Sequence, residues 1–241
     1  ADGYVMASYT GSNPKVKFLV TTPTGAQYQY RLTPGKGFQA FPLTEGPGEY
    51  TFATYENVSG EQYVPDLTQT VKLDAIDEFG PYLYPSQYVD FNADSRVVKE
   101  AAQLAQGAKD DLEVLQNVYS YVVKNIQYDD EKAANVQSGY LPAPDLILDT
   151  GKGICFDYAA VMASMLRSVG IPTQLQVGYM GTLYHAWVSI HVQGMGWING
   201  VIQFDGQEWT LMDPTTAASK GEKATAEFLQ TEGQYAAKYK Y

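Results

Sequence analysis

Apolar residues change their spacing once along this chain, and the change divides it into two regions. Up to Leu73 they alternate with polar residues in short segments separated by turn signals such as Pro34-Gly35; the clearest segments are KVKFLV, AQYQYRL, EYTFATY and TQTVKL. Alternation with a period of two is typical of antiparallel strands with one buried face. The first region is therefore predicted to form around six strands of a small sandwich of immunoglobulin-like type.

The second region follows a stretch without any period, DAIDEFGPYLYPSQ at residues 74–87, which we interpret as a linker. Beyond it the spacing becomes helical, and residues 110–126 form the clearest helix, with Asp110 placed to cap it and an apolar face made by Leu112, Leu115, Tyr119, Val122 and Ile126. A shorter helix is predicted near residues 95–106. We expect an antiparallel β-sandwich-like domain at residues 1–80 followed by an α+β domain at residues 81–241.

Charge and hydropathy disfavour two classes of partner. The net charge is −11, and the sequence contains no cluster of Lys and Arg that would form a basic patch. Neither a nucleic-acid backbone nor an anionic membrane surface is therefore an expected ligand. No apolar run approaches the roughly 20 residues that cross a bilayer.

The chain begins with Ala1 rather than Met, which suits a mature form whose export signal has been removed. A secreted or cell-surface protein is therefore expected, with its oligomeric state left open.

The single cysteine, Cys155, lies in GKGICFDYAA at residues 151–160. Apolar spacing predicts a buried helix over residues 155–169, which Gly170 and Pro172 end. Cys155 then sits in the first helical turn, where unpaired N–H groups and the helix dipole should lower the thiol pKa below about 8.5 and could hold an oxyanion. Because free cysteines in helices are more often core residues, a catalytic interpretation needs a base.

Only two histidines are available as that base, and both fall in LYHAWVSIHV at residues 183–192, which has the pattern of a strand. His185 and His191 point to the same face, but about 20 Å of strand separates them, so one reaction centre cannot use both. His191 lies close to a glycine turn and suits a structural role. His185 is flanked by Tyr184 and Trp187, which could shield its imidazole from water, and is the candidate base.

A carboxylate that orients the imidazole would complete the site. Asp213 ends the predicted strand in EWTLMDPTT, where Pro214 breaks the ladder, although an aspartate before proline is most often a turn residue. Asp205 competes with it, but Asp205-Gly206 is a strong turn signal and favours a structural role. Asp213 is therefore the candidate third residue.

Three blocks in this order, GKGICFDYAAVMASMLRSVGIPTQLQVGY, YHAWVSI and WTLMDPT, resemble the transglutaminase-like superfamily, in particular its bacterial members. The resemblance covers roughly residues 95–220. It implies a papain-like α+β core in which Cys155 is the nucleophile, His185 the general base and acid, and Asp213 the residue that orients the imidazole.

The chain departs from the animal transglutaminases in two respects. A tryptophan upstream of the cysteine helps to hold the oxyanion in those enzymes, and here no tryptophan precedes Cys155. Gln137 and Tyr140, in the loop before the nucleophile, are candidates to replace that donor, although loop packing is the ordinary role of such residues. The acidic calcium-binding loops of the animal enzymes are not identifiable, so neither a metal nor another cofactor is expected.

The resemblance implies an acyl-transfer enzyme that acts on amide bonds of proteins or peptides, cell-wall peptides included, through a Cys–His–Asp triad and a thioester. Water as the acceptor would make it a peptidase or amidase, and an amine would make it a transglutaminase. The alternative is a non-catalytic cell-surface binding or adhesion module that keeps the fold and presents its tyrosines to a ligand. A metal site made of Cys155, His185 and Asp213 is set aside, because structural zinc sites usually show paired ligands at short spacing.

Overall fold

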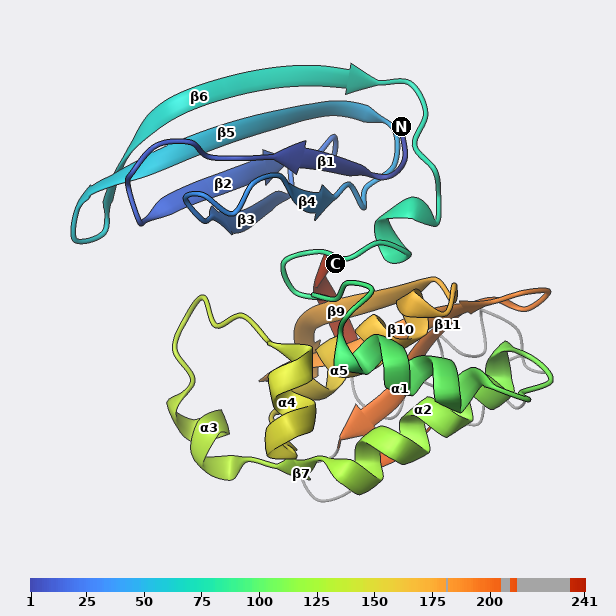
Figure 1. Ribbon diagram of the computed structural model, residues 1–241. Helices are drawn as coiled ribbons and strands as arrows, with labels where there is room; N and C mark the ends of the chain where they lie inside the picture. The colour runs from blue at the N-terminus through green and yellow to red at the C-terminus, as the bar shows by residue number, and fades with distance from the viewer. Residues whose placement is uncertain (181, 205–208, 212–234) are drawn as a thin grey trace. The chain divides into compact units, whose positions relative to one another are not determined.

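The computed structural model describes residues 1–180, 182–204, 209–211 and 235–241 (Figure 1). Within this part the chain forms two compact units, Ala1–Pro81 and Tyr82–Tyr241. The first is built from strands and the second from helices and an antiparallel sheet, so the predicted α+β class is confirmed. In these described residues no helix has the length and apolar character that a membrane crossing requires.

Two antiparallel sheets make up the first unit. One has four strands in the order β3-β2-β5-β6, and the other pairs β1 with β4. The strands are β1 (Tyr4–Ala7), β2 (Val16–Thr21), β3 (Gln27–Leu32), β4 (Gln39–Pro42), β5 (Gly48–Ser59) and β6 (Gln62–Leu73). The number of strands expected from the alternating segments is thus confirmed.

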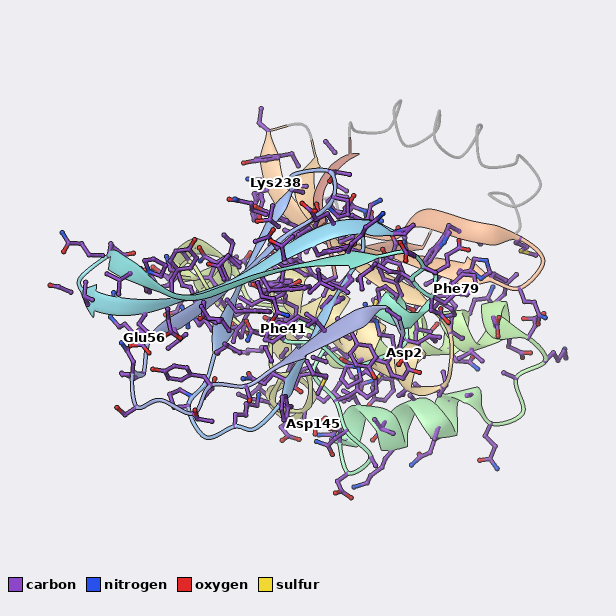
Figure 2. All side chains as sticks on the ribbon, turned by 90° about the horizontal axis from the view of Figure 1, so that it is seen from above. Asp2, Phe41, Glu56, Phe79, Asp145 and Lys238 are labelled. Carbon is purple, nitrogen blue, oxygen red and sulfur yellow. The ribbon has the colours of Figure 1, made fainter. Side chains whose placement is uncertain are left out.

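The side chains of β2 and β3 alternate in burial, as a period of two requires. Phe41 of β4, labelled in Figure 2, joins the two sheets, because its ring centroid lies 4.7 Å from that of Phe18 on β2 and 4.9 Å from that of Tyr30 on β3. Tilted aromatic pairs at these distances are favourable and bury a large apolar area. The first unit is therefore sandwich-like, with an aromatic core.

The second unit combines five helices and seven strands within the described residues. A short 3-10 helix, Gly80–Tyr82, leads into it. The helices are α1 (Arg96–Ala105), α2 (Asp111–Asn125), α3 (Asp130–Asn135), α4 (Pro144–Thr150) and α5 (Cys155–Ser168). The strands are β7 (Gln127–Tyr128), β8 (Lys152–Gly153), β9 (Thr173–Met180), β10 (Leu183–Val192), β11 (Gly196–Phe204), β12 (Trp209–Leu211) and β13 (Tyr235–Lys240).

Helix α2 begins where the sequence predicts, because the Asp110 carboxylate accepts the backbone N–H of Glu113 at 2.9 Å. Its buried face is shifted from the predicted one: the buried residues are Val114, Leu115, Val118 and Val122, whereas Leu112 and Tyr119 are only half-buried. Helix α1 is capped from a distance, since Asp145 of α4 accepts the N–H groups of Arg96 and Val97, each at 3.0 Å. Helices α1 and α4 are tied together by this bond pair.

Helix α5 forms the centre of the second unit. It contacts α1, α2 and α4 as well as strands β9 and β10, and Figure 1 shows it between the sheet and these helices. Every residue from Asp157 to Arg167 is buried, as expected for a helix covered on all sides. The five-stranded antiparallel sheet that it packs on has the order β12-β11-β10-β9-β13. The first residue of α5 therefore lies where the helix bundle meets the sheet.

Candidate active site

The glycines of GKGICFDYAA have separate roles at the start of α5. Gly151 ends α4 with a φ of 63°, in the left-handed region that glycine adopts without strain. Gly153 leaves room for the side chain two residues beyond Cys155, because a Cβ on it would lie 2.7 Å from the Cβ of Asp157. Asp157 can therefore turn back to accept the N–H of Ile154 at 2.9 Å, which is the acidic half of a capping box.

Cys155 is the first residue of α5 and is partly exposed. Its sulfur lies within hydrogen-bonding reach of the backbone of Ala186 on β10, and this bond, with another from Phe156, acts to lower the thiol pKa. Burial has the larger effect and raises the pKa of Cys155 above its ordinary value. The expectation that the helix start lowers the thiol pKa is therefore wrong, because desolvation of the thiolate outweighs the favourable amide groups.

His185 lies on β10 immediately before Ala186, whose backbone is near the Cys155 sulfur. It is 3% exposed, and its ring stacks on that of Trp187 with centroids 6.4 Å apart. Trp187 is held in turn, since its indole Nε1 donates to Gln176 Oε1 at 2.7 Å. Burial lowers the pKa of His185 to about 4, so the imidazole is neutral at pH 7 and able to accept a proton. Trp187 thus covers His185 as predicted, whereas Tyr184, the other residue expected to shield it, is 54% exposed.

Tyr128 is a neighbour of Cys155 that the sequence analysis missed. Its strand β7 pairs in parallel with β8, and the flanking N–H groups of Gln127 and Asp129 donate to Gly151 and Gly153 at 2.9 and 3.0 Å. Burial and the charge of the Cys155 sulfur raise the pKa of Tyr128 to about 12, while a hydrogen bond from the Cys155 backbone opposes the rise. The Tyr128 hydroxyl therefore lies within hydrogen-bonding reach of the Cys155 backbone and close enough to the sulfur to be affected by its charge.

The remaining candidate residues lie as follows. Asp213 is outside the described residues. Gln137 is exposed, and its amide donates to Asn135 O at 2.8 Å. Tyr140 directs its hydroxyl to Asp157 rather than to Cys155, with Oη donating to Oδ1 at 2.6 Å. His191 packs edge-on against Trp197, in keeping with a structural role.

Among residues 1–180, 182–204, 209–211 and 235–241, no group of three His, Cys, Asp or Glu side chains lies close enough together to hold a metal ion. The groups near Cys155 there are instead a phenol, backbone amides and one buried carboxylate. This set suits nucleophilic chemistry by a thiol.

A comparison with protein families bears on this arrangement. Residues 99–200 match the model of the transglutaminase-like superfamily. The resemblance to the transglutaminase-like superfamily is thereby confirmed for this segment of the chain. The matched segment contains Tyr128, Cys155 and His185, and the match supports a thiol enzyme in the general sense.

The proteins to which the chain is similar include some named as enzymes. The chain is 33% identical over 69 residues to a protein-glutamine gamma-glutamyltransferase of Pseudomonas aeruginosa, covering 23% of this chain and 10% of that one. It is 26% identical over 175 residues to the kyphoscoliosis peptidase of Homo sapiens, covering 68% and 23%. The periplasmic domain of TgpA from Pseudomonas aeruginosa aligns with a TM-score of 0.37 and 15% identity over 95% of this chain and 92% of that one. The matches span less than half of the length of these curated relatives.

Proposed function

We propose that the protein is a thiol-dependent acyl-transfer enzyme that acts on amide bonds of proteins or peptides. The observation that carries the proposal is the approach of the Cys155 sulfur to the backbone of Ala186, the residue next to His185. A nucleophile and a neutral base on adjacent elements are what such chemistry requires. Asp213, which follows β12 in the sequence, is proposed to orient the imidazole.

In the proposed reaction, His185 takes the thiol proton as the sulfur of Cys155 attacks an amide carbonyl. This order follows from the shifted pKa values, because burial favours a neutral thiol and a neutral imidazole over an ion pair before substrate binds. The imidazolium then protonates the departing amine, which leaves a thioester on Cys155. Water or a second amine resolves the thioester and regenerates the thiol.

The oxyanion formed during attack needs donors near the sulfur. We propose the backbone N–H of Cys155 and the hydroxyl of Tyr128, because the hydroxyl lies within hydrogen-bonding reach of that backbone. Tyr128 would then take the role for which the sequence suggested Gln137 and Tyr140. Tyr128→Phe removes only the hydroxyl and should lower kcat roughly 100-fold while the fold is retained.

The proposal is tested with casein as the acyl donor, in the presence and absence of a fluorescent primary amine. Ammonia release identifies glutamine as the donor, incorporation of the amine identifies a transglutaminase, and new amino termini identify a peptidase. Cys155→Ala should abolish whichever product appears, and His185→Gln should reduce it by several orders of magnitude. Lys152→Met, an exposed substitution three residues from Cys155, is the matched control and should retain full turnover.

Product that persists in Cys155→Ala would refute a thiol mechanism. Peptides from bacterial cell walls form a second donor panel, because an exported protein would meet them. Absence of product from both panels, together with retained binding of a cell-surface ligand by the tyrosine-rich first unit, would favour the adhesion module instead.

A further inference from the structure

A buried carboxylate lies two residues beyond the proposed nucleophile. Asp157 is fully buried, yet it carries no role in the reaction described above. Its Oδ2 accepts the N–H of Ile154 at 2.9 Å and the Nζ of Lys132 at 2.5 Å, and its Oδ1 accepts the Tyr140 hydroxyl at 2.6 Å. Within the described part of the chain these partners are all donors, and one of them is a cation.

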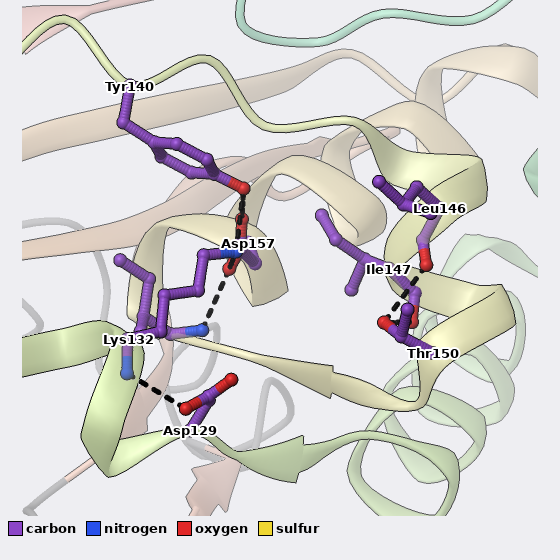
Figure 3. Close-up of polar contacts among 8 residues, drawn as sticks. Asp129, Lys132, Tyr140, Leu146, Ile147, Thr150 and Asp157 are labelled. Atoms are coloured by element: carbon purple, nitrogen blue, oxygen red, sulfur yellow. Dashed lines mark hydrogen bonds and ion pairs between the residues drawn. The ribbon is translucent and has the colours of Figure 1, made fainter. Parts of the chain in front are cut away.

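The cation comes from a different part of the chain. Lys132 lies in α3, whose N-terminus is capped by Asp129, and its stem carries the ammonium group to the start of α5 (Figure 3). Its Nζ also lies 2.7 Å from the hydroxyl of Tyr140 and 4.4 Å from the centroid of that ring. Lys132 is 28% exposed at the side chain whereas Asp157 is 0% exposed. The ion pair therefore joins a partly solvated cation to a buried anion.

Stabilising the start of a helix with a buried ion pair costs desolvation free energy. Burying a charge requires a partner and further hydrogen bonds, and an apolar replacement of similar volume is often as stable. The position of the charge gives it another consequence, since the negative charge of Asp157 raises the pKa of the nearby Cys155. The carboxylate also competes with a thiolate for the positive end of the α5 dipole.

The titratable groups around the Cys155 sulfur come from several elements. Tyr128 of β7 and Asp157 of α5 are both close enough to interact electrostatically with Cys155. His185 of β10 is the residue before Ala186, whose backbone lies near the sulfur. Tyr128 and the neutral imidazole add no charge at pH 7. The charge felt by the thiol from these groups is therefore that of Asp157 together with its counter-ion Lys132.

We propose that Lys132 and Asp157 are positioning residues that set the reactivity of Cys155, with Lys132 offsetting the carboxylate charge that would otherwise oppose formation of the thiolate. The inference deepens the proposed function, because it concerns the nucleophile of that same site. Tyr140 completes the arrangement by holding the second carboxylate oxygen, which fixes the side chain of Asp157 relative to the first turn of α5.

The test follows the pH dependence of Cys155 alkylation by iodoacetamide, measured by mass spectrometry on the full chain. Lys132→Met should shift the midpoint up by about one pH unit, and Asp157→Asn, which removes charge but keeps an acceptor, should shift it down by about as much. The double variant Lys132→Met/Asp157→Asn should return the midpoint to within about 0.3 unit of the original. Lys152→Met removes an exposed lysine and should move the midpoint by less than about 0.3 unit.

Shifts of the two single variants in the same direction, or no shift in either, would overturn the inference and leave the ion pair a structural feature. Circular dichroism checks that each variant is folded. If Lys132→Met does not fold, the downward shift in Asp157→Asn and its reversal toward the original value in the double variant still decide the outcome. A structural role alone does not produce shifts of opposite sign.

Failure of this inference is distinguishable from failure of the proposed function, because alkylation needs no substrate. Opposite shifts without turnover of casein or cell-wall peptides would support the ion pair while refuting the enzyme. Turnover that depends on Cys155, combined with unmoved alkylation midpoints, would support the enzyme while refuting the role of Lys132 and Asp157.

Discussion

The two ends of helix α5 each bury a charged side chain, and the charges are satisfied in different ways. At the N-terminal end the carboxylate of Asp157 is held by the side chains of Lys132 and Tyr140 as well as by one backbone N–H. Near the C-terminal end Arg167 is 3% exposed, and within the described residues its guanidinium donates only to backbone carbonyls, those of Tyr241, Tyr84 and Thr173, at 2.6–2.9 Å. Both charges have the sign that the helix dipole favours.

The difference indicates what each end does. Backbone carbonyls cannot be exchanged by mutation, so the guanidinium of Arg167 fixes α5 against three separated segments and serves stability. Side-chain partners can be changed by mutation without rebuilding the backbone, and Asp157 itself lies two residues beyond the proposed nucleophile, Cys155. The N-terminal end is therefore expected to control reactivity and the C-terminal end to control folding.

The largest expected effect is at the C-terminal end. Arg167→Met should lower the free energy of unfolding by roughly 3–5 kcal/mol, because buried carbonyl groups lose their donors. Urea unfolding measures the loss, and Arg96→Met is the control, since that guanidinium is 45% exposed and should cost less than about 1 kcal/mol. The alkylation midpoint of Cys155 in folded Arg167→Met should be unchanged, and a clear shift would contradict the division of roles.

A pH effect of nearly that size is expected from His185. Its pKa is lowered from 6.5 to about 4 by burial, so as pH falls below 6.5 the unfolded state takes up a proton that the folded state does not. Stability should fall by about 3 kcal/mol between pH 7.5 and 4, levelling off below that. The measurement is urea unfolding at pH 7.5 and 4.5 for the original chain and for His185→Gln. The variant should lose less stability over this interval, and equal losses would show that the imidazole is not buried in its neutral form.

A smaller change in stability is expected at the N-terminal end of α5, from a substitution of Gly153. Gly153→Ala places a methyl group 2.7 Å from the Cβ of Asp157, so that side chain must shift. We expect a loss of about 1–3 kcal/mol in urea unfolding together with an altered alkylation midpoint of Cys155. Lys152→Ala, at the exposed neighbouring position, should change neither quantity measurably. A stable Gly153→Ala with normal alkylation would mean that Asp157 does not influence the thiol.

Much of the fold could be predicted from local patterns. The alternation in β2 and β3 and the capping aspartate of α2 reflect interactions within a few residues, which the sequence displays directly. The strand that carries His185 could be predicted for the same reason. The buried face of α2 was placed partly wrong, because tertiary contacts rather than helical period decide which of two adjacent apolar stripes is covered.

The surroundings of the candidate nucleophile were harder to predict. Tyr128 lies in a two-residue strand that has no recognisable period and becomes ordered only by pairing with β8. Lys132 occupies a short helix with a polar sequence, where a lysine ordinarily faces solvent. Nothing local distinguishes either residue from an ordinary tyrosine or lysine. A search for aromatic or basic residues some 25 positions before the cysteine would have included both.

Local patterns are enough to predict that a cysteine starts a buried helix and that a histidine lies on a later strand, because periodicity and capping residues act over short distances. The identity of the groups near the sulfur, and their effect on its pKa, depend instead on how distant segments pack together. Desolvation depends on what covers the thiol, and here it outweighs the helix start and raises the pKa of Cys155. The approach of Lys132 to Asp157 likewise depends on packing between segments 25 residues apart.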